Sequence, residues 1–388
     1  MVIAYTSENK IYLAENGNKS EIPCGRITKY KEALDSIRRR SEWKNTGSGA
    51  QFMGTAVMPD SDEAAASARI TGICENNGRL VYGVALDQSS ALYQRSFDRN
   101  ETDEGLILSG NDLHFGAFDC IDGKMAVSMG ATHDELHICT LEPPSSVYTE
   151  HTDGDTMEQS PYWSRCNKNR IYFSTSGNAR NQYGAVGAVS PASGSYLDLD
   201  SGEMNEFLSD EKTDYLKIKD DKYGNIYYIR QPYGGEQRDD GVKFTDILLF
   251  PFRLFKGLFG WLNFMCTIWG GESLKSGGSG LPSELKSKQR TEKDIIIDGN
   301  IINAKRLAEA ADLKDDDMTG LMPAARVLVK READGTETVI AKSVLDYTVC
   351  RDGRLLYSNG RQIISYDGTS HKVMLKARFA MNIIECGE

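Results

Sequence analysis

A short two-strand unit recurs along this chain, and it constrains the fold more than any other feature. Each copy has an apolar strand, a polar turn rich in Gly, Asn or Asp, and a second strand rich in aromatic and β-branched residues. These turn residues tolerate the positive φ values that tight hairpins require. The copies begin at Ile70, Phe115, Ser160, Leu216 and Leu345. Such repetition predicts an architecture built from one antiparallel strand motif.

Further strands follow several copies, such as DELHICTLE from Asp134 and HKVML from His371. Four antiparallel strands per repeat are typical of a propeller blade. The C-terminal segment ARFAMNIIECGE supplies one more first strand, with Cys386 in the repeated position, and MVIAYTS from Met1 continues it. We therefore expect an all-β, six-bladed β-propeller over residues 1–388, with the N- and C-terminal strands closing one blade and covering both edges.

Two segments do not fit the repeat and are predicted to be partly helical insertions. Residues 26–67 carry apolar residues at helical spacing, at Tyr30, Leu34 and Ile37. Residues 232–324 interrupt the fifth blade, because ARVLVKREADGTETVIAK after them resembles the outer strands of a blade. We therefore expect a single propeller domain that carries both insertions.

The second insertion contains an amphipathic helix over 245–269, followed by a flexible, Gly-, Ser- and Lys-rich segment over 270–293. Of the 23 residues from Ile247 to Trp269, 16 are large and apolar. The others include a polar stripe at helical spacing, formed by Arg253, Lys256, Gly260, Asn263 and Thr267. Two cations near the middle of a bilayer are unfavourable, which disfavours a membrane span.

This helix has three remaining interpretations: it packs on its own propeller, docks into a protein partner, or lies in a membrane interface. Residues 241–293 hold eight Lys or Arg and four Asp or Glu, a net of +4, so the rest of the chain carries −15. A basic, aromatic-rich helix suits partner or anionic lipid surfaces. The candidate partner- or membrane-binding residues are Phe250, Phe252, Arg253, Phe255, Lys256, Leu258, Phe259, Trp261, Leu262, Phe264 and Trp269.

Composition narrows the choice of partner and compartment. Lys and Arg total 45 against 56 Asp and Glu, so the net charge is −11. A broad nucleic-acid surface needs clustered cations, and we expect no nucleic acid partner. The first residues, MVIAYTSENK, lack the basic and apolar regions of a signal peptide. We expect a cytoplasmic protein, with peripheral contact at the inner membrane left open.

Eight cysteines without a CxxC pair indicate reduced thiols rather than a disulfide framework or a zinc cluster. Equivalent positions in different blades are expected to lie around a wide ring, too far apart for sulfurs to share one metal. Five of the cysteines end the first strands of their copies, namely Cys74, Cys120, Cys166, Cys350 and Cys386. We expect these side chains to pack in the core, with no metal and no cofactor.

Catalytic motifs are absent from the sequence. It contains no GxSxG elbow, no GxxxxGK[ST] loop and no GxGxxG after a strand. His133 and His137 are the only near pair of histidines, and HDELH does not match the HExxH zinc motif. We expect a non-enzymatic protein without catalytic residues. The alternative is an enzyme or small-ligand-binding propeller with a site at the central channel, which would need inward-facing charged residues where the copies offer mostly Cys and apolar ones.

The copy QSPYWSRCNKNRIYFSTSG from Gln159 resembles the TolB-type propeller repeat, in which Pro and Trp precede a Ser, a polar turn and an apolar strand ending in Ser. This resemblance implies a propeller fold and no particular function, because such repeats occur in unrelated scaffolds.

A narrower resemblance rests on EALDSIRRRSEWKNTGSGAQFMG from Glu32, DKYGNIYYIRQPY from Asp221 and DILLFPFRLFKGLFGWLNF from Asp246. Together they resemble bacterial propeller proteins that accompany a MoxR-type ATPase and a von Willebrand factor A protein in three-component systems. The resemblance implies a non-enzymatic scaffold or recognition subunit with those two partners. We accordingly predict a protein-interaction role that uses the helix over 245–269.

Overall fold

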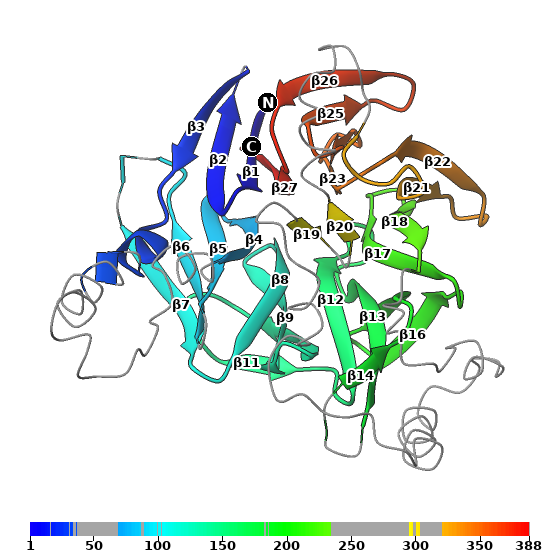
Figure 1. The fold of residues 1–388 in the computed structure, drawn as a ribbon, viewed down its shortest axis with the longest axis horizontal. Helices are drawn as coiled ribbons and strands as arrows, with labels where there is room; N and C mark the ends of the chain where they lie inside the picture. The colour runs from blue at the N-terminus through cyan, green and yellow to red at the C-terminus, as the bar shows by residue number, and fades with distance from the viewer. Residues whose placement is uncertain are drawn as a thin grey trace, which may run out of the picture.

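The computed structural model describes most of the chain (Figure 1). The described residues are 1–30, 32–33, 36, 69–233, 295–302 and 320–387, except positions 16, 87–88, 99, 102, 182–183, 185 and 298–299. The predicted helix over 245–269 and the segment over 270–293 therefore lie outside the described residues. Of the first insertion, residues 26–30 lie in a described helical stretch that begins at residue 25.

The described strands form antiparallel units that follow one another along the chain. One unit contains β4 (Arg69–Asn76), β5 (Arg79–Ala85), β6 (Ser90–Arg95) and β7 (Glu104–Gly110). The next contains β8 (His114–Ile121), β9 (Lys124–Thr132), β10 (Glu135–Leu141) and β11 (Tyr148–Glu150). A parallel pairing of Leu136 in β10 with Met157 joins this unit to the third one in a nine-stranded sheet. A third contains β12 (Thr156–Trp163), β13 (Arg170–Arg180), β15 (Ser193–Asp198) and β16 (Glu203–Leu208), with β14 (Val186–Val189) beside β13.

The remaining units keep the same pattern. One contains β17 (Thr213–Asp220), β18 (Ile226–Pro232), β21 (Val327–Arg331) and β22 (Glu337–Lys342). Another contains β23 (Asp346–Val349), β24 (Leu355–Ser358), β25 (Gln362–Tyr366) and β26 (His371–Lys376). The last contains β27 (Met381–Cys386), β1 (Val2–Ser7), β2 (Lys10–Glu15) and β3 (Asn18–Ile22).

The first strands of these units form a closed ring. Each contacts the next in the order β4, β8, β12, β17, β23 and β27, and β27 contacts β4 again. Figure 1 shows the sheets arranged around this ring. Radial packing of antiparallel sheets around a central axis defines a propeller. The predicted all-β propeller class is therefore confirmed.

The N- and C-terminal strands close one sheet. β27 pairs with β1 antiparallel, with Val2 opposite Cys386 and Ala4 opposite Ile384. This pairing is the closure that the position of Cys386 predicts from the sequence. It gives each terminal strand a hydrogen-bonded neighbour and removes an exposed edge at the junction.

The unit from β17 to β22 is interrupted in sequence but continuous in space. β18 pairs directly with β21, with Tyr228 opposite Val329, although residues 233–326 separate the two strands along the chain. Within the interrupting segment, β19 (Ile295–Ile297) and β20 (Asn300–Ile302) pair as a two-stranded hairpin. Insertions at such a place leave the sheet intact because its hydrogen bonds join the flanking strands.

Several first strands carry an irregularity at a similar place. Extra residues on one strand of an antiparallel pair bend it and re-aim the side chains that follow. The register shifts lie between Ile70 and Gly72 in β4, Phe115 and Phe118 in β8, Gln159 and Tyr162 in β12, and Leu216 and Lys219 in β17. These shifts sit just before the residues that form the candidate site.

The apolar core lies between neighbouring sheets. Phe118 of β8 packs against the unit that begins with β4, where Gly72 and Gly83 leave room for its ring. A Cβ atom at Gly83 would lie 2.9 Å from that ring, which is too close for a carbon contact. The glycines of GICENNGRLVYG therefore bring the two sheets close together at this point.

Candidate functional site

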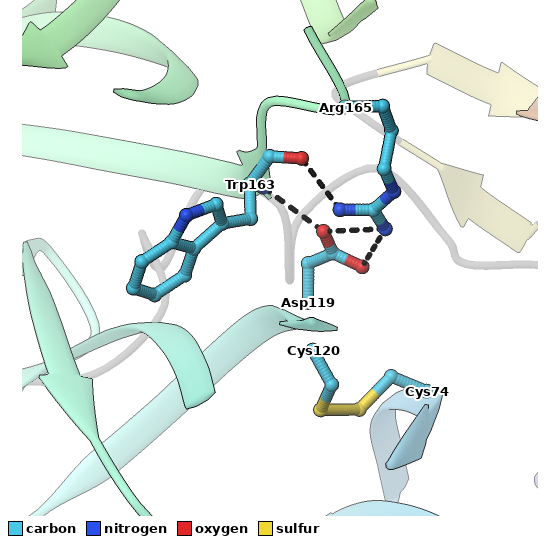
Figure 2. The surroundings of a disulfide bond; sticks show 5 residues. All are labelled: Cys74, Asp119, Cys120, Trp163 and Arg165. Carbon is cyan, nitrogen blue, oxygen red and sulfur yellow. Dashed lines mark hydrogen bonds and ion pairs between the residues drawn. A yellow bond between two sulfur atoms is a disulfide. The ribbon is translucent and has the colours of Figure 1, made fainter. Parts of the chain in front are cut away.

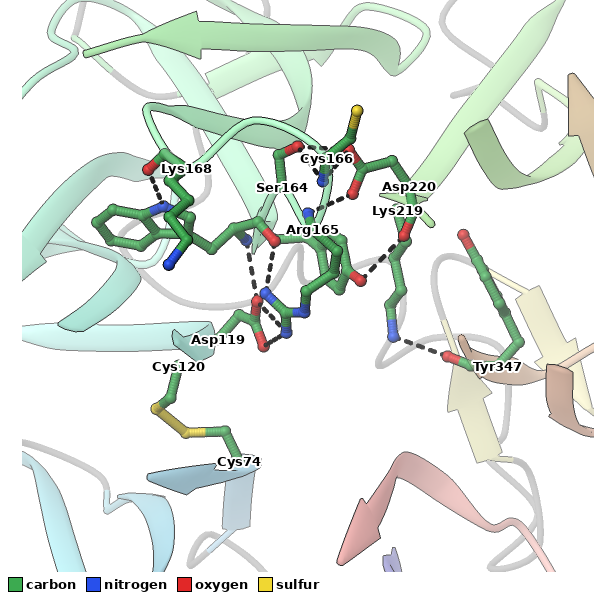
Figure 3. A network of polar contacts seen from close by, with 12 residues as sticks. Cys74, Asp119, Cys120, Ser164, Arg165, Cys166, Lys168, Lys219, Asp220 and Tyr347 are labelled. Atoms are coloured by element: carbon green, nitrogen blue, oxygen red, sulfur yellow. Dashed lines mark hydrogen bonds and ion pairs between the residues drawn. A yellow bond between two sulfur atoms is a disulfide. The ribbon is translucent and has the colours of Figure 1, made fainter. Parts of the chain in front are cut away.

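Charged side chains from several first strands lie close together, and Figure 3 shows Asp119, Arg165 and Lys219 among them. From the sequence we expect mostly Cys and apolar residues at the ends of these strands, but the structure also brings charged side chains together there. The charged residues come from β8, the turn after β12, β17 and β23, namely Asp119, Arg165, Lys217, Lys219 and Asp346. Asp119 and Arg165 each lie one residue before a cysteine of the repeat, so the pattern of cysteines alone does not reveal them.

Asp119 and Arg165 form the first part of the cluster (Figure 2). The Arg165 guanidinium lies 3.0 Å from the Asp119 carboxylate, and the backbone N–H of Trp163 donates to the same carboxylate at 2.9 Å. The guanidinium carbon also lies 4.4 Å from the ring centre of Tyr162. Arg165 is therefore held between a carboxylate and an aromatic face, a position that suits its planar cation.

The turn that carries Arg165 is fixed by Asp220 at the end of β17. The buried Asp220 carboxylate accepts hydrogen bonds from the Ser164 hydroxyl and, at 2.7 Å, from the Arg165 backbone N–H. The Tyr162 hydroxyl donates to the Asp220 carbonyl oxygen at 3.1 Å. Burial raises the pKa of Asp220 above its ordinary value, although these hydrogen bonds favour the ionised form. The WSRC segment thus depends on a residue from the next unit.

Lys217 and Asp346 form a second ion pair, between β17 and β23. The Lys217 ammonium lies 2.9 Å from a carboxylate oxygen of Asp346, which is almost fully buried. That carboxylate also accepts the backbone N–H groups of Tyr347, at 2.8 Å, and of Asn382. Burial alone would raise the pKa of Asp346, but Lys217 and Lys219 together hold it below its ordinary value. Asp346 is therefore ionised, and its carboxylate is occupied by the ion pair and by the two backbone hydrogen bonds.

Lys219 lies between these two pairs and has a different environment. Its ammonium donates to the Tyr347 carbonyl oxygen at 2.8 Å and lies 5.1 Å and 5.7 Å from the ring centres of Tyr347 and Tyr162. Among the described residues, no carboxylate oxygen lies within 4.0 Å of it. Burial lowers the pKa of Lys219 to about 8, against the raising effects of Asp346 and Asp119. We call Tyr162, Lys219 and Tyr347 the Lys219 site.

The site lies next to a disulfide that the sequence analysis does not predict. Cys74 at β4 and Cys120 at β8 are bonded, with their Cα atoms 6.0 Å apart. The expectation of reduced thiols is therefore wrong for this pair. The predicted ring is too wide, because the first strands converge and bring equivalent positions of adjacent units within disulfide range. Free thiols among the described residues are Cys24, Cys139, Cys166, Cys350 and Cys386.

His133 and His137, which are close in sequence, have different surroundings in the structure. His133 contacts His114 with the two rings tilted by 51° and their centres 3.8 Å apart, and its Nδ1 lies 3.4 Å from the Arg69 guanidinium. His137 instead lies 3.0 Å from the buried Glu158 carboxylate, whose hydrogen bond raises the pKa of His137. The two histidines of HDELH therefore have separate partners: His133 contacts His114 of the same unit, and His137 contacts Glu158 of the next unit.

The predicted partner- or membrane-binding residues from Phe250 to Trp269 lie outside the described residues, so their role stays a prediction. In the described ranges, no group of three or more His, Cys, Asp and Glu side chains is arranged to hold a metal ion. Within the same ranges, no helix has the length and apolar character needed to cross a membrane.

Known proteins resemble this chain only in fold. No family model and no curated protein sequence matches it. TolB from Acinetobacter baumannii is similar at 8% identity and a TM-score of 0.49, over 98% of this chain and 65% of that one. The structure titled nidogen/laminin complex shares 6% identity and a TM-score of 0.49, over 98% and 97% of the two chains. The putative TolB from Agrobacterium tumefaciens shares 12% identity and a TM-score of 0.41, over 81% and 84%.

The predicted resemblance to TolB-type propellers thus reappears among solved structures, and this chain spans about two thirds of the first TolB chain. Sequence identities this low indicate a similar fold and carry no information about function. The properties of the Lys219 site rest on the contacts described above.

Proposed function

We propose that this protein is a non-enzymatic recognition subunit, whose Lys219 site binds an acidic group of a partner protein. The observation that carries the proposal is the environment of Lys219, a partly buried residue whose ammonium has one protein acceptor and no carboxylate within 4.0 Å among the described residues. An ammonium group has three donors, so two remain for a ligand. A partner carboxylate would supply the charge that the site lacks and form charge-assisted hydrogen bonds.

The surroundings of Lys219 favour binding by a preformed site. Arg165 and Lys217 are each held by their own carboxylate, Asp119 and Asp346. The Tyr347 hydroxyl donates to the Lys217 carbonyl oxygen at 2.5 Å, which fixes one aromatic wall of the site. Side chains already ordered before binding lose little conformational entropy when a ligand arrives. The site thus holds one ammonium without a carboxylate partner between two ordered tyrosine rings. This arrangement suits selective recognition of one anionic group.

Fluorescence anisotropy can test this proposal. The probe is a short fluorescein-labelled peptide of alternating Glu and Gly residues (the Glu peptide), compared with the same peptide carrying Gln in place of Glu (the Gln peptide). We expect saturable binding of the Glu peptide only. Lys219→Gln should weaken it about tenfold or more, because a hydrogen bond between charged groups is lost.

Lys168→Gln is the matched control. Lys168 is exposed and pairs with the exposed Asp122 near the site, so its loss should leave peptide affinity unchanged. Equal binding of the Glu and Gln peptides, or equal affinity of Lys219→Gln and the unaltered protein, would contradict the proposal.

The lowered pKa of Lys219 favours a second candidate function, catalysis by its amine. A lysine that is partly neutral near pH 8 can attack a carbonyl carbon and form an imine with loss of water. Borohydride reduction in the presence of a panel of aldehydes and keto acids, followed by mass spectrometry, tests this candidate. A reduced adduct confined to Lys219 would favour the enzyme; unmodified Lys219 would favour recognition alone.

We also propose a more specific role for the protein, as a scaffold in a complex with particular partners. The sequence stretches from Glu32, Asp221 and Asp246 support a cytoplasmic complex with a MoxR-type ATPase and a von Willebrand factor A protein, in which the helix over 245–269 makes the contact. The triple variant Phe255→Asp, Phe259→Asp and Trp261→Asp should abolish co-purification with these partners, or sedimentation with anionic vesicles. Unchanged behaviour in both assays would exclude the helix as the contact.

A further inference from the structure

The Cys74–Cys120 disulfide joins two adjacent units at the end nearest the Lys219 site. Cys74 belongs to β4 and Cys120 to β8, and 46 positions separate them in the sequence. The bond therefore crosses the contact between two sheets rather than a turn within one sheet. Breaking it would remove the covalent link between β4 and β8 and leave their packing contacts.

A short series of contacts leads from this bond to the site (Figures 2 and 3). Cys120 directly follows Asp119, so the position of the disulfide sulfur and the position of the Asp119 carboxylate depend on the same backbone. Asp119 binds both Arg165 and the Trp163 backbone N–H. Arg165 packs on Tyr162, which is one aromatic wall around Lys219.

Asp119 and Arg165 also act on Lys219 through charge. The carboxylate raises and the guanidinium lowers the pKa of Lys219, so the ammonium responds to the position of both groups. A shift of β8 relative to β12 would separate Asp119 from the turn that carries Arg165. The cation would then lose its fixed place beside Tyr162, and the aromatic wall would lose its support.

We propose that the Cys74–Cys120 disulfide controls the affinity of the Lys219 site, and that its reduction by a dithiol weakens binding of an acidic ligand. This inference rests on the proposed function. In the reduction, the S–S bond accepts two electrons and two protons and becomes two thiols, while the dithiol becomes a disulfide. Both cysteines are buried, so the contact between β4 and β8 must open before the reductant reaches the sulfurs.

The proposal links binding to the redox state of the compartment. A reducing cytoplasm keeps most thiols reduced. In such a compartment the site would be in its weak state and would gain affinity on oxidation. In an oxidising compartment the site would stay in its strong state.

The test compares the oxidised and the dithiothreitol-reduced full-length protein in the same Glu-peptide titration, with the disulfide state confirmed by mass spectrometry. We expect reduction to weaken binding about fivefold to tenfold. The double variant Cys74→Ser and Cys120→Ser should bind as weakly as the reduced protein and should not respond to dithiothreitol. Cys166→Ser removes an exposed free thiol and should keep the full redox response.

A second readout separates this inference from the proposed function. Carbon-13 NMR of the Lys219 side chain, assigned with Lys219→Arg, reports its pKa without any ligand. We expect this pKa to differ between the oxidised and reduced proteins. If the oxidised protein does not bind the Glu peptide, the proposed function fails and the NMR comparison still decides the redox inference. If the peptide binds, equal affinity in the two redox states would overturn the inference. If no peptide binds, an equal pKa of Lys219 in the two redox states would overturn it.

Discussion

The contact between β4 and β8 has two ends with different chemistry. At one end, Cys74 and Cys120 form a covalent bond next to the Asp119 carboxylate, which is fully used by its partners. At the other end, the tilted rings of His114 and His133 are in contact beside Arg69. Burial, together with the charge of Arg69, lowers the pKa of both imidazoles.

This difference shows how one pair of strands can be held by a covalent bond at one end and be sensitive to pH at the other. The disulfide end holds its geometry through a bond that does not depend on pH. The histidine end brings together groups that would repel one another when protonated. We therefore expect the Lys219 site, which lies on the disulfide side, to depend strongly on redox state. The histidine end should respond weakly, and to acid.

Breaking the covalent end should have the largest effect on stability. For a loop of 46 residues, the chain-entropy model gives about 4 kcal/mol of stabilisation by the disulfide. The double variant Cys74→Ser and Cys120→Ser should lose roughly this amount in urea unfolding. Cys166→Ser is the control and should unfold like the unaltered protein. An equal free energy of unfolding for all three proteins would show that the bond does not hold the two units together.

Removing the charge of Asp119 should have the next largest effect. Asp119→Asn can still accept the Trp163 N–H but leaves the largely buried Arg165 guanidinium without its counter-charge. We expect a loss of about 1 to 2 kcal/mol in the free energy of unfolding. Asp122→Asn breaks the exposed pair with Lys168 and should leave the free energy of unfolding nearly unchanged, because solvent screens that pair. Equal losses in the two variants would contradict the structural role of Asp119.

Replacing Lys219 should raise stability while it removes binding. Because burial lowers the pKa of Lys219 to about 8, its charged form is disfavoured in the folded protein. Lys219→Met should therefore stabilise the protein by about 1 to 2 kcal/mol at pH 7. The unfolded chain holds the proton up to the ordinary lysine pKa, so this advantage should shrink as the pH rises above about 8. A variant less stable than the unaltered protein at pH 7 would show that Lys219 has a structural role.

Acid should act weakly at the histidine end. The pKa of His114 and of His133 is lowered in the folded protein, so the unfolded chain binds protons first as the pH falls below the ordinary histidine value. Stability should fall over this range, and His133→Gln should reduce the fall. His137 works in the opposite direction because Glu158 raises its pKa, and its contribution is lost as the pH rises. A fall in stability unaffected by His133→Gln would place the acid response elsewhere.

The fold was predictable because it depends on patterns along the chain. Hairpin spacing and turn residues predict the strands, and the repeated cysteine at Cys386 predicts the pairing of β27 with β1. The disulfide was not predictable in the same way. Whether Cys74 and Cys120 approach within 6.0 Å depends on how closely two sheets pack, and Gly72 and Gly83 set that distance through their contact with Phe118.

The candidate site was only partly visible in the sequence. The alignment of the copies places Lys219 or Asp220 where the others have cysteine, which marks β17 as different. The partners of Lys219 come from separate units, and the register shift between Leu216 and Lys219 re-aims the side chain. A pattern along one strand cannot specify such a shift, so the cluster around Lys219 requires the structure.

Our proposal depends on Lys219 being a cation without a carboxylate partner in the site, which can therefore bind an acidic ligand. The most direct test is the carbon-13 NMR titration of Lys219 in the oxidised protein, with and without a saturating amount of the Glu peptide. We predict a pKa near 8 without the peptide and a clear increase with it, because a carboxylate beside the ammonium favours the charged form. A pKa at the ordinary lysine value of about 10.4, unchanged by the peptide, would contradict the claim.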